Sequence, residues 1–248
     1  MKEIKNIYDN EEFLKGYLQI RRSNANHNDL IEQPAMKKLL PDVKGKSVLD
    51  LGCGYGANTV SFARQGAKRV VGVDISQKML EKAKVENSHP CVQYLNMDMG
   101  KIGELEGKFD IVYSSLAFHY VEDFCKLIKD IYSLLNNGGV LLFSQEHPIT
   151  TATFDGLGDF NKAENGEYLS YTFSNYCQSG KRVVNWFVDG LVKYHRPFSE
   201  IISAIIDTGL TITAVCEPVP DEKIIKEVPR MAKELLKPSF LIIKAEKR

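Results

Sequence analysis

The sequence has no excess of charge of either sign. It contains 32 lysines and arginines and 32 aspartates and glutamates in 248 residues, so its formal net charge at pH 7 is zero. A protein that binds a nucleic-acid backbone usually carries clustered basic residues, and the charges here are scattered along the chain. We therefore expect no nucleic-acid partner.

Cysteines and long apolar runs are also scarce. The five cysteines are an odd number and form no C-x-x-C pair, which argues against a disulfide framework and against a zinc site. No apolar run approaches the roughly 20 residues of a membrane span, and residues 1–10 lack the apolar stretch of a signal peptide. We expect a soluble, cytoplasmic protein with no metal and no membrane partner.

What the sequence does contain, from residue 46 onward, is an alternation of short apolar runs with amphipathic stretches. Strands are expected at residues 47–51, 69–73, 92–95, 109–114 and 140–145, and helices between them at 58–65, 77–86 and 123–135. This alternation predicts parallel strands with right-handed helical crossovers. A helix at 197–208 and strands at 210–216 and 240–245 follow. Since the linker between the last two strands is rich in proline, we expect the last strand to run antiparallel.

The expected fold is α/β, a three-layer sandwich around a mostly parallel seven-stranded sheet. An N-terminal helical cap (1–45), with helices at 11–20 and 29–40, precedes the core (46–145), and residues 197–248 close the sheet. Between them lies an inserted β-rich lid (146–196). A hairpin is expected there, pairing 168–177 with 183–194 around the turn residues 178–181. Because 248 residues approach the limit of one hydrophobic core, we expect one domain with an insertion.

A glycine-rich loop follows the first strand of the core. Gly52, Gly54 and Gly56 let the backbone approach a ligand at the helix N-terminus, and Asp74 ends the next strand, where a carboxylate can accept both ribose hydroxyls of an adenosine. The pattern is G-x-G-x-G, whereas the nicotinamide dinucleotide fingerprint has its third glycine one residue later. No lysine or arginine between residues 48 and 63 is available to neutralise a phosphate. A cationic cofactor therefore fits better than a dinucleotide.

With the glycine loop, Asp74, the segment 96–99 and the segment 109–120 in this order, residues 47–145 resemble the class I, seven-stranded Rossmann-like S-adenosylmethionine-dependent methyltransferases, of the small-molecule and ubiquinone-biosynthesis-like type. The resemblance implies that S-adenosylmethionine is the cofactor and S-adenosylhomocysteine its product. The residues implied as the cofactor site are Asp50, Gly52, Cys53, Gly54, Gly56, Asp74, Ile75, Asp98, Met99, Ser114, Ser115 and Leu116.

The resemblance also implies what each part of this site binds. The glycine loop holds the methionine part and Asp74 the ribose. Asp98 faces the adenine amino group, and Met99 offers its backbone to the ring. The residues after the fourth strand line the methyl-donor pocket.

Methyl transfer from a sulfonium is an in-line displacement, so the protein mainly positions donor and acceptor and excludes water. A base with a pKa near neutrality would help if the acceptor were a hydroxyl or a protonated amine. His119, just after the fourth strand, is the first candidate for this catalytic role. The alternative is a structural histidine beside Tyr120.

The acceptor pocket is expected in the parts of the chain that the core does not account for. The candidate substrate residues are Tyr17, Arg21 and Arg22 in the N-terminal cap, and His147, Trp186, Tyr194 and His195 in the insertion. They would enclose a small-molecule acceptor, and the arginines would favour an anionic one. Solvated arginines and plain hairpin packing of the aromatic residues are the alternatives. We expect a monomer or a homodimer.

Two other functions stay open at this point. One is an NAD(P)-dependent Rossmann oxidoreductase, and the other is a non-catalytic S-adenosylmethionine-binding protein. An Asn-Pro-Pro-Tyr motif for nucleobase amino groups is absent, since Ser114–Ala117 takes its place. Glu122 and Asp123 begin a helix, where negative charge is favourable, and they do not indicate a magnesium site. The acceptor is not identified by any motif.

Overall fold

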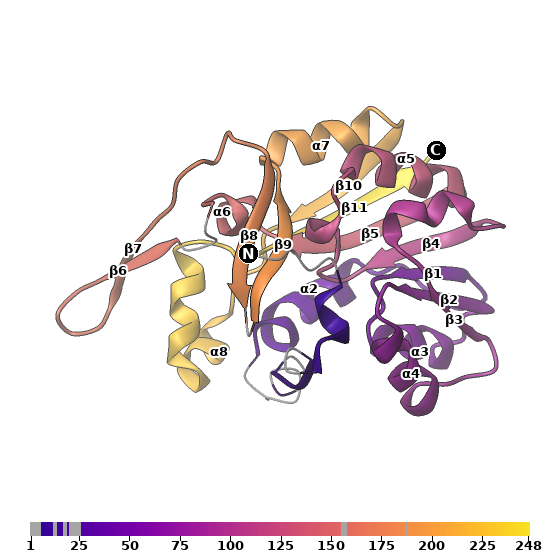
Figure 1. Cartoon of the computed structure of the whole chain (residues 1–248), viewed down its shortest axis with the longest axis horizontal. Coiled ribbons are helices and arrows are strands. Elements are labelled where there is room, and N and C mark those ends of the chain that lie inside the picture. Colours follow the sequence, from indigo (N-terminus) through magenta and orange to yellow (C-terminus); the bar gives the residue numbers. More distant parts are fainter. Residues whose placement is uncertain (1–5, 12–13, 17–18, 20–25, 155–157, 187) are drawn as a thin grey trace.

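A seven-stranded sheet with the order β10-β11-β5-β4-β1-β2-β3 forms the centre of the computed structural model (Figure 1). The structure describes residues 6–11, 14–16, 19, 26–154, 158–186 and 188–248, with backbone alone at 7, 186, 188 and 189. The strands are β1 (Ser47–Leu51), β2 (Arg69–Asp74), β3 (Val92–Asn96), β4 (Phe109–Ser114), β5 (Leu135–Glu146), β10 (Leu210–Cys216) and β11 (Phe240–Lys247). Only β11 pairs antiparallel with its neighbours in this sheet. The expected fold class is confirmed.

Helices cover both faces of the sheet (Figure 1). One face carries α5 (Phe124–Leu134), α7 (Phe198–Ile206) and the 3-10 helix η3 (Met99–Glu104), and the other carries α2 (Gln33–Leu39), α3 (Ala57–Arg64) and α4 (Gln77–Glu86). Val48 and Leu49 are both fully buried, in the clusters of opposite faces. Successive side chains of a strand point to opposite sides, so a strand covered on both faces is apolar throughout.

The carboxyl ends of five strands follow one another along one edge of the sheet. Because β3, β2, β1, β4 and β5 are parallel and adjacent in that order, the residues at or just after their ends form a row. That row runs from Asp98 through Asp74, Gly52 and Ser115 to Glu146. Open α/β sheets bind their ligands at this edge.

The N-terminal part of the chain lies against the same edge. The turn η1 (Ile7–Asp9) is held by Asp9, whose Oδ1 accepts hydrogen bonds from the Ser76 hydroxyl at 2.7 Å and the Lys78 backbone N–H at 3.2 Å. The expected helix at 29–40 is a π-helical turn, η2 (Asn28–Glu32), followed by α2. Of the expected helix at 11–20, residues 11, 14–16 and 19 are described, and they are helical.

The insertion is rich in β-structure, but its hairpins are not where the sequence predicted them. After the short α6 (Pro148–Thr151), β6 (Asp159–Lys162) pairs with β7 (Tyr168–Thr172), and β8 (Gly180–Trp186) pairs with β9 (Val188–His195), as two separate sheets. The predicted pairing of 168–177 with 183–194 is therefore wrong. The chain turns earlier, at Asn175, which has φ 63° and whose backbone oxygen accepts a hydrogen bond from Gln178 N–H. Gly180 and Lys181 already belong to β8 and do not form a hairpin turn.

Two other boundaries differ from the sequence prediction. The linker between β10 and β11 contains α8 (Glu222–Glu227) and the 3-10 helix η5 (Pro229–Leu235). The sequence predicted no helix there, because the linker is rich in proline. Helix α5 ends at Leu134, where β5 begins at once, so Gly138 (φ 74°) bends the start of a strand and does not cap a helix.

Asp110 joins three strands near their amino ends, on the side of the sheet opposite to the row described above. Its Oδ2 accepts hydrogen bonds from the backbone N–H and the hydroxyl of Ser47 at 2.8 and 2.9 Å, and its Oδ1 accepts one from the Asn136 amide at 2.8 Å. Burial raises the pKa of Asp110, but these hydrogen bonds and the charge of Lys68 outweigh it and lower the pKa to about 2. The ionised carboxylate therefore stabilises the junction of β1, β4 and β5.

We expect Asp110→Ala to lower the free energy of unfolding at pH 7 by about 1–3 kcal/mol, because it leaves partly buried donors without an acceptor. Since the folded pKa of Asp110 lies below its ordinary value of 3.8, the difference from wild type should shrink as the pH falls from 3.8 towards 2. Urea unfolding at several pH values measures both effects. Equal stability of the two proteins at pH 7 would contradict the role of Asp110.

Candidate functional site

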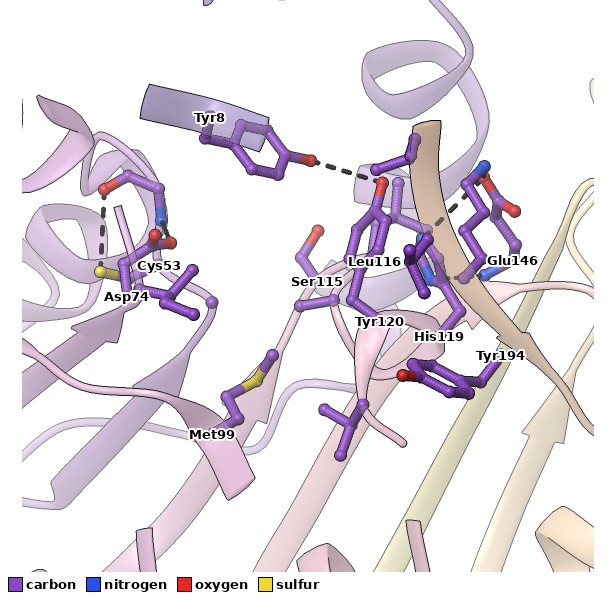
Figure 2. A pocket seen from close by; sticks show the side chains of 18 of the residues that line it. Tyr8, Cys53, Asp74, Met99, Ser115, Leu116, His119, Tyr120, Glu146 and Tyr194 are labelled. Carbon is purple, nitrogen blue, oxygen red and sulfur yellow. Dashed lines mark hydrogen bonds and ion pairs between the residues drawn. The ribbon is translucent and has the colours of Figure 1, made fainter. Parts of the chain in front are cut away.

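One cavity of about 940 Å³ lies along the carboxyl edge of the sheet (Figure 2). Residues at or after the carboxyl ends of the five parallel strands contribute to its wall, together with Tyr8 of η1 and side chains of β8 and β9. This volume is at the upper end of the roughly 300–1,000 Å³ of small-ligand pockets. The expected cofactor residues on the wall are Asp50, Gly52, Cys53, Gly54, Asp74, Ile75, Asp98, Met99, Ser115 and Leu116. Gly56 and Ser114 do not line it.

The three glycines of the loop meet different surroundings. All have positive φ, at 69°, 55° and 82°, which glycine adopts without strain. A Cβ on Gly52 would lie 2.4 Å from the Cβ of Ala117, and a Cβ on Gly56 would lie 2.2 Å from the hydroxyl of Tyr94. A Cβ on Gly54 would meet nothing within 4 Å. Gly52 and Gly56 are thus needed for packing, while Gly54 leaves open space beside the cavity.

Two buried carboxyl groups stand beside this loop. Asp74 Oδ2 accepts a hydrogen bond from Gly54 N–H and Oδ1 accepts one from Ser76 N–H, each at 2.8 Å. Asp50 accepts a hydrogen bond from the Thr59 hydroxyl at 2.6 Å. Burial raises the pKa of both carboxyl groups, and that of Asp50 reaches about 7. The hydrogen bond from Gly54 N–H attaches the backbone of the loop to Asp74 at the end of β2.

The wall on either side of the glycine loop is formed by the turns after β3 and β4. Asp98 caps η3 by accepting a hydrogen bond from Gly100 N–H at 2.8 Å, which places Met99 on the cavity. Leu116 has φ 55°, a conformation that is uncommon for a residue with a Cβ. Its N–H donates to the backbone oxygen and the hydroxyl of Ser144, both at 3.0 Å, which holds this turn.

His119 and Glu146 lie at the far end of the cavity, beyond β4 (Figure 2). Lys193 also lines the cavity and pairs with Glu146. Glu146 Oε1 lies 2.5 Å from Lys193 Nζ and 3.9 Å from His119 Nε2. His119 Nδ1 accepts the backbone N–H of Glu146 at 3.3 Å. Burial lowers the pKa of His119 to about 4, in spite of Glu146, so its imidazole is neutral at pH 7.

The expected substrate residues have different positions. Tyr194 lines the cavity, while His147 caps α6 and lies 2.7 Å from Glu217. His195 is fully buried between the Thr151 hydroxyl and the Tyr176 backbone oxygen. Neither histidine is on the cavity wall. The expectations for Tyr17, Arg21, Arg22 and the Trp186 side chain fall outside the described residues.

Sequence reasoning missed several residues on the cavity wall, and four of them have polar side chains that meet in pairs. Tyr8 lies 3.5 Å, hydroxyl to hydroxyl, from Tyr120, and the pair spans the cavity above Ser115 (Figure 2). Glu146 and Lys193 form the second pair. Only Glu146 had a usable signal, because a carboxylate that ends a parallel strand lies at the ligand-binding edge.

Carboxyl groups outnumber basic groups on the cavity wall. Six acids face three bases, the acids being Asp50, Asp74, Asp98, Glu122, Asp123 and Glu146 and the bases Lys126, Arg182 and Lys193. Lys126 is paired with Asp130, and Arg182 donates to four backbone oxygens. The wall therefore favours bound molecules whose total charge is positive.

Among the described residues no cluster of histidine, cysteine or acidic groups could hold a metal ion. No described helix is long and apolar enough to cross a membrane.

Comparison with known proteins agrees with this geometry. Residues 48–139 match the family described as methyltransferase domain. The crystal structure of an S-adenosylmethionine-dependent methyltransferase from Mesorhizobium loti is 35% identical, with a TM-score of 0.80 over 87% of this chain and 97% of that one. An uncharacterized protein of Haemophilus influenzae is 36% identical over 97% of this chain and 96% of its own length.

A shorter match has a named acceptor. Trans-aconitate 2-methyltransferase from Deinococcus radiodurans is 35% identical over 43% of this chain and 40% of its own length. The longer matches decide against the NAD(P)-dependent oxidoreductase considered above. The chain belongs to the class I, seven-stranded Rossmann-like S-adenosylmethionine-dependent methyltransferases, and S-adenosylmethionine is its cofactor.

Proposed function

We propose that the protein methylates a small molecule bound next to the cofactor in the 940 Å³ cavity. The observation that carries this proposal is the continuity of the cavity from Asp74 and Asp98 at one end to Glu146 and Lys193 at the other. The likeness to a methyltransferase for trans-aconitate supports a small acceptor. The zero net charge supports the absence of a nucleic-acid partner. A cytoplasmic location and a monomeric or homodimeric state are part of the same proposal.

The residues at the first end of the cavity fit the cofactor. Asp74 accepts one hydrogen bond on each oxygen, and a carboxylate has about four lone-pair sites, so two ribose hydroxyls can still be accepted. Gly54 leaves space for the methionine part, while Asp98 and Met99 would face the adenine. The cofactor, when bound, supplies a methyl group on a sulfonium. Ser115 and Leu116, after β4, then line the methyl-donor side.

We assign residues 146–196 as a lid over the acceptor. Val184, Leu191, Val192 and Tyr194 of β8 and β9 line the cavity, and Tyr8 approaches from the N-terminal side. Apolar and aromatic side chains exclude water from the reacting atoms, which a displacement at an electrophilic carbon requires.

His119 acts in this proposal as a positioning residue. Because Nδ1 accepts the Glu146 N–H, the hydrogen of the neutral imidazole is on Nε2, which faces Glu146 Oε1. In this tautomer neither nitrogen has a free lone pair to take a proton. The base role expected from the sequence therefore gives way to a role in holding the end of β5.

A screen of small-molecule acceptors with S-adenosylmethionine, followed by detection of S-adenosylhomocysteine, tests the function. We expect acceptor-dependent product. A protein that binds S-adenosylhomocysteine in calorimetry but turns over no acceptor would instead be the non-catalytic cofactor-binding protein.

We expect Asp74→Ala to weaken S-adenosylhomocysteine binding by about 1.5–3 kcal/mol, the range of hydrogen bonds to a charged group. Calorimetry measures the affinity, and circular dichroism checks that the fold is kept. Asp110→Ala is the control, since it removes a carboxylate at the opposite edge of the sheet and should leave the affinity unchanged. Wild-type affinity in the Asp74 variant would reject the ribose assignment.

Gly54→Ala and Gly52→Ala form a matched pair, because both place a Cβ at positive φ. We expect Gly54→Ala to cost about 1–2 kcal/mol of stability and to weaken cofactor binding about tenfold, since its methyl group enters the ligand space. Gly52→Ala should cost about 1–3 kcal/mol more stability, because its Cβ meets Ala117. Urea unfolding and calorimetry separate the two effects. Normal cofactor binding by Gly54→Ala would make this glycine a turn residue only.

The protonation of His119 should appear in the pH dependence of stability. Its folded pKa of about 4 lies below the ordinary 6.5, so the unfolded state binds the proton more readily and stability falls as the pH drops from 6.5 to 4. The loss from this residue is at most about 3 kcal/mol. His119→Asn keeps an acceptor for Glu146 N–H and should lack this part of the loss. Identical pH profiles for the two proteins would refute the assignment.

A further inference from the structure

Glu146 and Lys193 form an ion pair on the wall of the acceptor end of the cavity. Glu146 is the last residue of β5 and Lys193 belongs to β9, so the pair joins the core to the insertion. Their side chains are 21% and 12% exposed, and both line the cavity. Lys193 and His119 both lie near Oε1 of Glu146, and among the described residues none donates a hydrogen bond to Oε2.

Glu146 stays ionised in spite of its burial. Burial raises its pKa, but the charge of Lys193 and the other nearby cationic groups outweigh burial and bring the pKa to about 2. Removing a carboxylate from water is expensive, and apolar residues could hold two strands together as well. A charged carboxylate that keeps one oxygen available to a ligand cavity is therefore a candidate ligand-binding group.

We infer that Glu146 binds the methyl acceptor through Oε2, and that the acceptor is a nucleophile bearing hydrogen, an amine or a hydroxyl. This inference rests on the proposed function, since it concerns the acceptor of the same reaction. The row of strand ends supports it. Cofactor residues follow β3, β2 and β1, the methyl-donor wall follows β4, and Glu146 at the end of β5 is next in order.

The charge of the cavity points in the same direction. Its wall has an excess of carboxyl groups, and the cofactor brings one net positive charge. If the acceptor is a neutral amine or hydroxyl, the total charge of the bound molecules is +1 before methyl transfer and, until a proton is released, also after it. If the acceptor is a carboxylate, its negative charge cancels that of the cofactor, and the total charge is zero before and after the reaction. A carboxylate would also face the Glu146 anion. The wall thus favours an acceptor that donates a hydrogen bond.

The two kinds of acceptor use Glu146 differently. In a hydroxyl, an oxygen lone pair forms the new bond to the methyl carbon while the carbon–sulfur pair leaves with sulfur. The hydroxyl proton, which has become strongly acidic on the methylated oxygen, passes to Glu146 Oε2 and then to water, because the pKa of Glu146 is about 2. A neutral amine attacks in the same way with its nitrogen lone pair but keeps its hydrogens, and becomes an ammonium beside the Glu146 anion. Electrostatic stabilisation of charge that develops during the reaction is the larger part of such a role.

The first test identifies the product. Wild-type protein is incubated with S-adenosylmethionine labelled with ¹³C in the methyl group and with a small-molecule extract of bacterial cells, and the labelled product is examined by NMR and mass spectrometry. An N-methyl amine or an O-methyl ether is expected, and the methyl chemical shift distinguishes them. A methyl ester, thioether or C-methyl product would overturn the inference while keeping the proposed function. Absence of any labelled product would overturn the proposed function.

The second test measures binding without turnover. The acceptor identified in the first test is titrated by calorimetry into the protein loaded with S-adenosylhomocysteine. Glu146→Gln keeps an oxygen for Lys193 but loses the charge, and we expect acceptor binding to weaken about tenfold with unchanged S-adenosylhomocysteine affinity. Glu217→Gln is the matched control, because Glu217 also faces a histidine but lies off the cavity. Wild-type acceptor affinity in Glu146→Gln, or an equal loss in the control, would refute the role of Glu146.

Discussion

The hydrogen bonds from Gly54 N–H and Ser76 N–H to the Asp74 carboxylate hold together the end of the cavity that lies over β1 and β2. They connect the loop after β1, the end of β2 and the start of α4 through one side chain. Asp9 of η1 attaches to the same helix start through Ser76 and Lys78. The positions of the glycine loop and of the N-terminal turn therefore both depend on the end of β2.

A second carboxylate supports the cavity wall at the turn after β4. Glu32, at the end of η2, is fully buried and accepts hydrogen bonds from the hydroxyls of Ser115 and Ser144 at 2.9 and 2.5 Å. Ser144 in turn accepts the N–H of Leu116, whose left-handed conformation costs energy. A residue of the N-terminal cap thus stabilises a strained turn after β4, which gives this cap a physical part in the site.

The features that the sequence predicted are those with a local pattern. Leu210–Cys216 was expected as a strand and is one, because its apolar residues fall within one short segment. The glycine loop and Asp74 are likewise read from single stretches of chain. The pairing of Glu146 with Lys193 joins residues 47 positions apart, and no local pattern marks it. The β8–β9 hairpin was misplaced because Gly180 resembles a turn residue but begins a strand. Tyr8 and Glu32 reach the site only through tertiary packing.

The preference for a cationic cofactor over a dinucleotide follows from Asp50. In dinucleotide sites the pyrophosphate occupies the positive N-terminal end of the helix after the glycine loop. Here Asp50 accepts a hydrogen bond from Thr59, in the first turn of α3, so a carboxyl group already faces that end of the helix. With Asp50 only 2% exposed and no basic side chain in residues 48–63, a phosphate would meet a buried acid with nothing to neutralise it. An ammonium or a sulfonium meets the opposite situation, since each ionised carboxylate on this wall attracts it and a nearby cation favours the ionised form of Asp50.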